Sequence, residues 1–226
     1  ITNFIVSING DNFIDSPENS MNLNKTITLI KGADTLEEVW FIARDRMGNQ
    51  AMGKVDIYLK GDVSWQPVVS FSQVTLGAQL NNDTGGFFAP ADSTINTLQE
   101  AYGKQALIEL VYFYDHAGDE NTIASPGANI DNTVFPGPYG LDNWTVKNTT
   151  RFKVTSITSQ QFDAITNDSL LIAAYGLTEG KRKAKNLSAG DIYSFMTESG
   201  HRGLFRVSKV YGTDSGSIII DIKTQK

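Results

Sequence analysis

The sequence predicts a mostly β protein of two modules, with a short β-sandwich over residues 1–62 and a larger α+β domain over residues 63–226. Three observations predict this. Apolar and polar residues alternate in many short stretches, as half-buried strands require. Capping signals in the second half predict two or three short helices there. We place the junction between the modules at residues 63–67, which Gly61 precedes and Pro67 ends.

The first module is predicted to contain strands at Phe4–Ile8, Thr26–Leu29, Val39–Ala43 and Val55–Leu59. Val39–Ala43 is apolar at every position, which is typical of a strand in the centre of a sandwich. Between the last two strands, Asp45–Asn49 places an aspartate three residues before a glycine. Glycine supplies the positive φ that a tight reversal needs, so this segment predicts a hairpin.

The segment Ala43–Asn49, together with the strand Val55–Leu59, resembles the final hairpin of bacterial immunoglobulin-like domains. In those domains a D-x-x-G-N turn joins the last two strands. The resemblance implies that residues 1–62 form an immunoglobulin-like β-sandwich. Such a fold usually has about 100 residues, so one or two strands are expected to be missing or reduced.

The second module begins with a predicted strand that runs to Leu80. Thr94 is the predicted N-cap of a helix over Ile95–Tyr102, which Gly103 would end. The stretch Leu107–Tyr114 has the strongest strand pattern in the chain. The order strand, helix, strand indicates a mixed α+β domain.

The periodicity stops between Asp115 and Asn148, which predicts a long loop, and a strand is expected again over Arg151–Ile157. Thr158 and Gln161 have the spacing of a capping box, which predicts a second helix. A third helix is expected from Asp168 or Ser169 to Gly176. The chain is then predicted to end in a meander of three strands, which are Ile192–Thr197, Leu204–Val210 and Ile218–Ile222.

Six short passages of the second module resemble a single family, the uncharacterised cell-surface lipoproteins of Bacteroidetes in which such a domain follows an immunoglobulin-like one. They are Gly85–Phe88, Thr97–Tyr102, Ile108–Tyr114, Ile123–Pro126, Gly190–Phe195 and Gly203–Val207. The resemblance implies export and anchoring to the outer membrane through a lipidated cysteine that this sequence does not contain. It implies no activity and no functional residues.

Composition excludes several classes of function. The net charge of −6 disfavours nucleic-acid binding, because an acidic surface repels phosphate. The absence of cysteine excludes disulfides, thiolate metal sites and a thiol nucleophile. No apolar stretch approaches the length of about 20 residues that a membrane span requires. The expected partners are a glycan or a surface protein, with membrane attachment only through a lipid anchor.

The aromatic residues of the long loop are the candidate ligand-binding residues. Phe135, Tyr139 and Trp144 lie among proline, glycine and asparagine, where demand for core packing is low. Exposed rings beside polar groups are what stacking on a sugar ring requires. In the alternative interpretation these rings fold back and close a satellite core under the loop.

Acidic residues supply the only candidate metal sites, and no other cofactor is predicted. The first candidate, a site for calcium or another divalent cation at the start of the loop, comprises Asp115, His116, Asp119 and Glu120. A second candidate for calcium comprises Asp11, Asp15 and Glu18. The alternative for both groups is a polar, solvated loop.

We recognise no catalytic constellation in the sequence, so a non-catalytic extracytoplasmic binding or adhesion module is the first functional hypothesis. The second is a cell-surface glycoside hydrolase-like enzyme that uses two carboxylates. Its candidate acids are Asp115, Asp119, Glu120, Asp131 and Asp142. The third is a structural accessory subunit of a surface complex, which a large exposed apolar patch would indicate.

Overall fold

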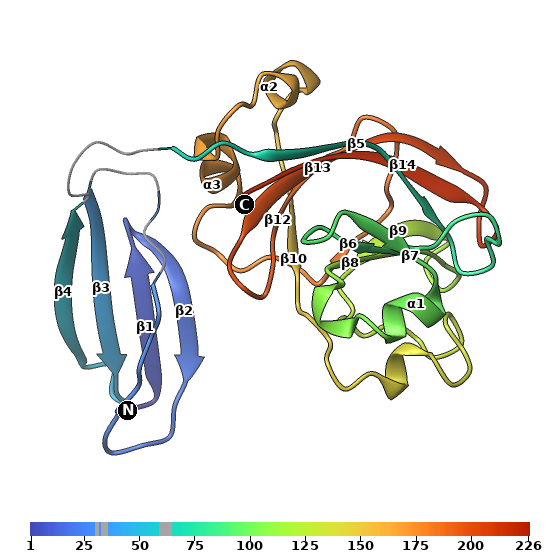
Figure 1. Cartoon of the computed structure of the whole chain (residues 1–226). Helices are drawn as coiled ribbons and strands as arrows, with labels where there is room; N and C mark the ends of the chain where they lie inside the picture. Colours follow the sequence, from blue (N-terminus) through green and yellow to red (C-terminus); the bar gives the residue numbers. More distant parts are fainter. Residues whose placement is uncertain (30–31, 33–35, 59–64) are drawn as a thin grey trace. The chain divides into compact units, whose positions relative to one another are not determined.

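A computed structural model describes residues 1–29, 32, 36–58 and 65–226 of the chain (Figure 1). The chain divides into two compact units. Unit 1 contains Ile1–Trp65 and Gly176–Glu179, and unit 2 contains Gln66–Tyr175 and Gly180–Lys226. The predicted domain boundary between residues 62 and 63 lies outside the described residues. None of the helices in the described part is long and apolar enough to cross a membrane.

Unit 1 is built on an antiparallel sheet with the strand order β2-β1-β3-β4. The strands are β1 Asn3–Ile8, β2 Asp11–Pro17, β3 Leu36–Arg44 and β4 Gln50–Tyr58. β3 pairs with both β1 and β4, which confirms the central strand predicted from its apolar sequence. Phe4, Val6, Ile8 and Val39 form its core. The described strands of unit 1 belong to this one sheet, and the immunoglobulin-like sandwich stays a prediction.

Two strand predictions in unit 1 need correction. The segment Thr26–Leu29 has no regular secondary structure, although Ile27 and Leu29 pack against the core. The strand β2, which the sequence analysis did not predict, pairs with β1 instead. Its burial pattern is mostly exposed, because it lies at the edge of the sheet, and an edge strand shows weak alternation.

The predicted hairpin between β3 and β4 is confirmed, and its aspartate does more than favour a turn. One carboxylate oxygen of Asp45 accepts hydrogen bonds from the backbone amides of Met47 at 2.8 Å and Asn49 at 2.9 Å. The other accepts from the side chain of Asn49 at 2.7 Å. Gly48 has a φ of +83°. These bonds to the charged form hold the pKa of Asp45 below its ordinary value.

Unit 2 has two antiparallel sheets. The first has the order β10-β12-β13-β14-β5, with β10 Arg151–Val154, β12 Ile192–Met196, β13 Arg202–Tyr211, β14 Ser217–Thr224 and β5 Val69–Gly77. The second has the order β11-β9-β8-β6-β7, with β11 Lys183–Ala184, β9 Glu120–Ala124, β8 Leu110–Asp115, β6 Phe87–Ala89 and β7 Thr94–Asn96. The predicted C-terminal meander is confirmed as β12, β13 and β14.

The main core of unit 2 lies between these two sheets. Leu76 and Phe205 from the first sheet pack in one cluster with Phe88 and Tyr112 from the second. Residues next to them in sequence face the other way, so Phe87 and Val111 belong to a separate cluster. The second sheet is therefore buried on both faces, which explains why β8 is apolar at nearly every position.

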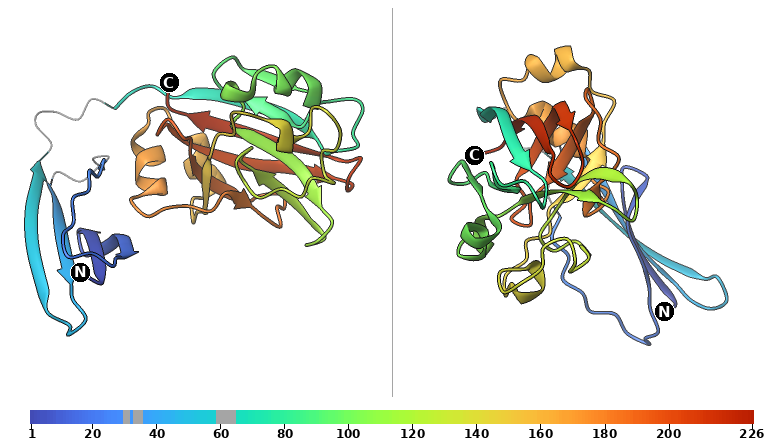
Figure 2. Two further views of the ribbon diagram at one scale, coloured as in Figure 1. Left: turned by 90° about the horizontal axis from the view of Figure 1, so that it is seen from below. Right: turned by 90° about the vertical axis from the view of Figure 1, so that its right-hand side faces the viewer.

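Short helices and loops cover the outer faces of the two sheets. Figure 2 shows α2 on the outer side of the first sheet and α1 on the outer side of the second. The helices are α1 Leu98–Tyr102, α2 Ser159–Asp163 and α3 Ser169–Tyr175, with 3₁₀ turns η1 at Gln105–Leu107 and η2 at Leu141–Asn143. Phe162 and Leu171 from α2 and α3 pack with Leu204 of the first sheet. The observed fold is mostly β with a few short helices, as predicted.

The capping box of α2 is confirmed, since the hydroxyl of Thr158 accepts from the backbone of Gln161 and the side chain of Gln161 accepts in return. The start of α1 was predicted wrongly. Thr94 begins strand β7, and the helix is capped by Thr97 in a second capping box with Glu100. The polar pair Thr97–Glu100 has the same spacing, so the signal was present one turn further along.

The long loop predicted over residues 115–148 is also partly wrong. Its first part is strand β9, which pairs with β8 from Asp115↔Glu120 to Val111↔Ala124. The remainder contains η2 and folds over the outer face of the second sheet, where its apolar residues join the cluster around Phe87. A loop of this length is tolerated because it packs a core of its own.

Candidate functional site

Two of the three predicted ligand-binding rings lie in the core of unit 2. Phe135 and Trp144 are buried and pack on Phe87, with ring centroids 5.0 and 5.8 Å away. The indole nitrogen of Trp144 donates a hydrogen bond to the backbone carbonyl of Tyr139 at 2.9 Å. Tyr139 is 37% exposed and meets Tyr102 edge to face. The burial supports the satellite-core interpretation for Phe135 and Trp144, and leaves Tyr139 as the ring open to a ligand.

The acidic residues predicted to bind a metal lie in and around the turn between β8 and β9. Lys185 pairs with Glu120 and lies 4.0 Å from Asp115. Asp119 accepts a hydrogen bond from the hydroxyl of Tyr114. His116 points towards Asp214, at 3.6 Å. Among the described residues, no three histidine or acidic side chains are grouped so as to hold a metal ion.

Three of the remaining candidate acids, Asp131, Asp15 and Glu18, are also engaged in local interactions. Asp131 accepts from the hydroxyl of Thr133 at 2.6 Å. Near the N-terminus, Asp15 accepts from a side-chain amide, and Glu18 pairs with Lys25. Asp142 lies exposed in η2. These contacts are those of structural turns and surface pairs.

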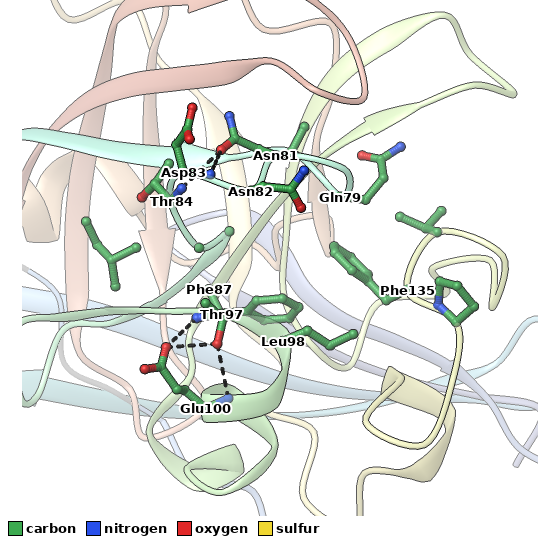
Figure 3. A pocket seen from close by; sticks show the side chains of 16 residues that line it. Gln79, Asn81, Asn82, Asp83, Thr84, Phe87, Thr97, Leu98, Glu100 and Phe135 are labelled. Atoms are coloured by element: carbon green, nitrogen blue, oxygen red, sulfur yellow. Dashed lines mark hydrogen bonds between the residues drawn. The ribbon is translucent and has the colours of Figure 1, made fainter.

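Two hollows of ligand size lie in unit 2. The first, of about 480 Å³, lies between the loop after β5 and the segment around Phe135 (Figure 3). Its polar side chains are mostly committed to the fold. The amide of Asn81 accepts from two backbone amides and donates to two carbonyls. Thr97 and Glu100 bond to each other. This groove therefore offers few free polar groups to a ligand.

The second hollow, of about 680 Å³, we call the Glu109 cleft. Its apolar lining residues are Val69, Phe71, Pro90, Ala91, Ala106 and Leu107. Its polar lining residues are Ser93, Glu109, Asn148, Thr197, Glu198, Ser199, His201, Thr224, Gln225 and Lys226. A concave site with an apolar lining and a few convergent polar groups is the usual form of a ligand-binding pocket.

Glu109 is held in place by its neighbours in sequence and by two neutral donors. It lies between the fully buried Ile108 and Leu110, and its backbone amide donates to the carbonyl of Phe88 at 3.1 Å. Its carboxyl group accepts from the hydroxyl of Thr150 and from the side chain of Asn148 at 3.3 Å. Asn148 is itself fixed by hydrogen bonds to the carbonyls of two residues that precede Glu109.

Burial raises the pKa of Glu109 to about 7, the hydrogen bond from Thr150 opposes the shift, and the nearby charge of Glu198 adds to it. Burial disfavours a carboxylate that has no cation beside it, so the proton is retained up to neutral pH. Titratable groups with shifts of this size are concentrated at functional sites. The carboxyl group therefore changes charge in the pH range in which the protein would meet a ligand.

The turn between β12 and β13 also lines the cleft. The hydroxyls of Thr197 and Ser199 are 2.9 Å apart, and Ser199 is 2.8 Å from Nδ1 of His201. The carboxylate of Glu198 accepts from the backbone amide of Thr149 at 3.0 Å. This turn therefore contributes hydroxyl, imidazole and carboxylate groups to the lining of the cleft.

Glu109 was not among the candidate residues predicted from the sequence, although a signal for it was present. Glu109 is the only charged residue in Leu107–Tyr114, the most strand-like stretch of the chain. A charged residue within an apolar strand is seldom buried without a partner or a function. Its partners are far away in sequence, so spacing alone could not have assembled the cleft.

We expect the replacement Glu109→Gln to stabilise the protein at pH 8 by about 1–2 kcal/mol and to leave stability at pH 4 unchanged. The raised pKa means that the folded state holds its proton more tightly than the unfolded state. The contribution of Glu109 to stability is therefore fully present below its unfolded pKa of about 4.3 and is lost as the pH rises through about 7. Glutamine keeps the shape and removes the charge.

Urea unfolding at both pH values measures this effect, with the exposed Asp142→Asn as the control for loss of one negative charge. A stabilisation of equal size at pH 4 and pH 8 would contradict the role assigned to burial of the charge.

The fold and the cleft together define the class of protein. It is a mostly β protein whose second unit packs two antiparallel sheets and contains a cleft of ligand size. No protein-family model and no curated protein sequence matches the chain. A solved structure does resemble it. This is a DUF4466 family protein from Parabacteroides merdae, with a TM-score of 0.51 and 12% sequence identity over 84% of this chain.

The chain spans 62% of the length of that Parabacteroides protein. At 12% identity the similarity is one of fold. It agrees with the resemblance to an uncharacterised Bacteroidetes family that the short sequence passages indicated.

Proposed function

We propose that the protein is a non-catalytic extracytoplasmic binding or adhesion module that holds a glycan or protein ligand in the Glu109 cleft. The observation that carries the proposal is the cleft itself, about 680 Å³ in volume and lined by both apolar and polar residues. A cleft of this size accommodates a sugar ring or a large side chain. Its polar groups come from several separate segments of the chain, so the folded unit presents them together.

The location is part of the same proposal. The resemblance of the second module to Bacteroidetes lipoproteins supports attachment to the outer membrane at the cell surface, with unit 1 as the immunoglobulin-like domain. The similarity of fold to a protein of Parabacteroides merdae adds support for the same group of bacteria.

Filling the cleft tests the proposal. Ala91 lines the cleft and is exposed, so Ala91→Trp adds bulk there without disturbing the core. Ala117, exposed in the turn between β8 and β9, provides the matched control Ala117→Trp. We expect micromolar binding to at least one member of a glycan array or an immobilised panel of extracellular proteins. Ala91→Trp should reduce it at least about tenfold, and Ala117→Trp should retain it.

Two results would contradict the proposal. One is the absence of any micromolar ligand in either collection. The other is a ligand whose affinity is the same for the wild-type protein and Ala91→Trp, since such a ligand would bind elsewhere.

A further inference from the structure

Two carboxyl groups enter the Glu109 cleft from different parts of the fold. Glu109 directly precedes β8 of the second sheet, and Glu198 lies in the turn between β12 and β13 of the first. Within the described part of the chain, neither forms an ion pair with a lysine, arginine or histidine. The donors that reach them are the neutral groups of Asn148, Thr149 and Thr150. These two carboxyl groups therefore have no cationic partner among the described residues, although Lys226 also lines the cleft.

The apolar residues of the cleft determine what kind of cation would fit. Val69, Phe71, Pro90 and Leu107 line it together with the carboxyl groups. A small inorganic cation would gain nothing from an apolar lining. A cation on a hydrocarbon stem would place its stem against these residues and its charge against the carboxylates. The ring of Phe71 adds a surface that a guanidinium group can also contact.

The energetics of Glu109 favour such an occupant. A half-buried carboxylate without a cation destabilises the ionised form, and an opposite charge within hydrogen-bonding distance removes that penalty. The hydrogen bonds from Thr150 and Asn148 already orient the carboxyl group. An arginine side chain can then donate to a carboxylate with two parallel hydrogen bonds, a geometry that lysine does not offer.

From this arrangement we infer that the Glu109 cleft binds a basic side chain of a protein partner, with its guanidinium or ammonium group at Glu109 and Glu198 and its stem on the apolar lining. The inference rests on the proposed binding function and names the ligand chemistry for the same cleft. Protons compete with the ligand for Glu109. The lining also contains the basic side chains of His201 and Lys226.

The test uses a blocked pentapeptide, Gly-Gly-Arg-Gly-Gly, and the same peptide with citrulline, which keeps the shape and loses the charge. Affinities for the full chain are measured by calorimetry or NMR titration at pH 8 and pH 5.5. We expect the citrulline peptide to bind at least about tenfold more weakly at pH 8. We expect the arginine peptide to lose about tenfold or more in affinity at pH 5.5, as Glu109 takes up its proton.

Two variants test whether the arginine peptide binds in the Glu109 cleft. Glu109→Gln should lower arginine affinity at pH 8 and remove most of its pH dependence. Asp142→Asn removes one exposed charge outside the cleft and should change neither. Equal affinity for the two peptides, no measurable binding of the arginine peptide, or an unchanged Glu109→Gln variant would overturn the inference.

A glucosamine oligomer, which also carries ammonium groups, serves as the third probe. Binding of this oligomer without binding of the arginine peptide would overturn the assignment to a protein partner. The inference can fail while the proposed function stands. A neutral glycan whose binding Ala91→Trp abolishes, in a protein that does not bind the arginine peptide, would be that result.

Discussion

Replacement of Trp144 with alanine is expected to destabilise the protein by about 3–5 kcal/mol, the range for removing a buried aromatic side chain. Trp144 is 4% exposed, packs with Phe87 and Leu141, and holds the carbonyl of Tyr139 through its indole nitrogen. Its loss would leave a cavity beneath the loop and an unsatisfied backbone acceptor. Urea unfolding monitored by circular dichroism measures the change.

Two variants control this experiment. Trp144→Phe keeps most of the packing and removes the hydrogen bond, so its cost should be smaller, about 1–2 kcal/mol. Tyr139→Ala removes an exposed ring from the same loop and should cost less than about 1 kcal/mol. If Trp144→Ala left stability unchanged, the ring would not belong to the core, and a role in ligand stacking would be favoured again.

Local signals predicted the start of α2 and the turn after β3 correctly, because the causes of both are local. The Thr158–Gln161 capping box and the Asp45 turn are set by hydrogen bonds between residues a few positions apart. The short strands β6, β7 and β11 were missed because they depend on partners elsewhere in the chain. A strand of two or three residues is too short for alternation to be recognised.

The candidate site was predicted less well than the short strands, because it too depends on residues that are far apart in the sequence. Composition and loop context drew attention to Phe135 and Trp144, which the fold buries, since a long loop can pack a core of its own. The residues that line the Glu109 cleft range from Val69 to Lys226 in the sequence. Its two acidic residues, Glu109 and Glu198, are also far apart in the sequence. Separations of this kind follow from sheet topology. The one sequence signal for Glu109 is its charge among the apolar residues of the stretch Leu107–Tyr114.

Replacement of Asp221 with alanine is expected to cost about 3 kcal/mol at pH 7, because it breaks a buried network. Asp221 is 9% exposed and lies opposite a β-bulge, where the pairing of β14 with β5 shifts between Ile220↔Val74 and Ile222↔Phe71. Its carboxylate accepts from the backbone amide of Gln73, from Arg206 and from Ser208, each at 2.9 Å.

The pH dependence of this variant has a definite sign. Burial opposes ionisation of Asp221, but the hydrogen bonds from Gln73, Arg206 and Ser208 together outweigh it and hold the pKa below its ordinary value. A lowered folded-state pKa stabilises the protein above the unfolded value of about 3.9, and the contribution is lost as the pH falls through the folded value. The difference between wild type and Asp221→Ala should therefore shrink at pH 3.

Arg206 provides an internal control, because it pairs with two carboxylates at the same distance of 2.9 Å. The side chain of Asp163 is 63% exposed, whereas that of Asp221 is 12% exposed. Water and salt screen the exposed pair, so Asp163→Ala should change stability by less than about 0.5 kcal/mol. Equal costs for the two variants would show that the ion pair itself stabilises the sheet. A large cost for Asp221 alone would show that the stabilisation comes from burial of the carboxylate and from its hydrogen bond with the backbone amide of Gln73.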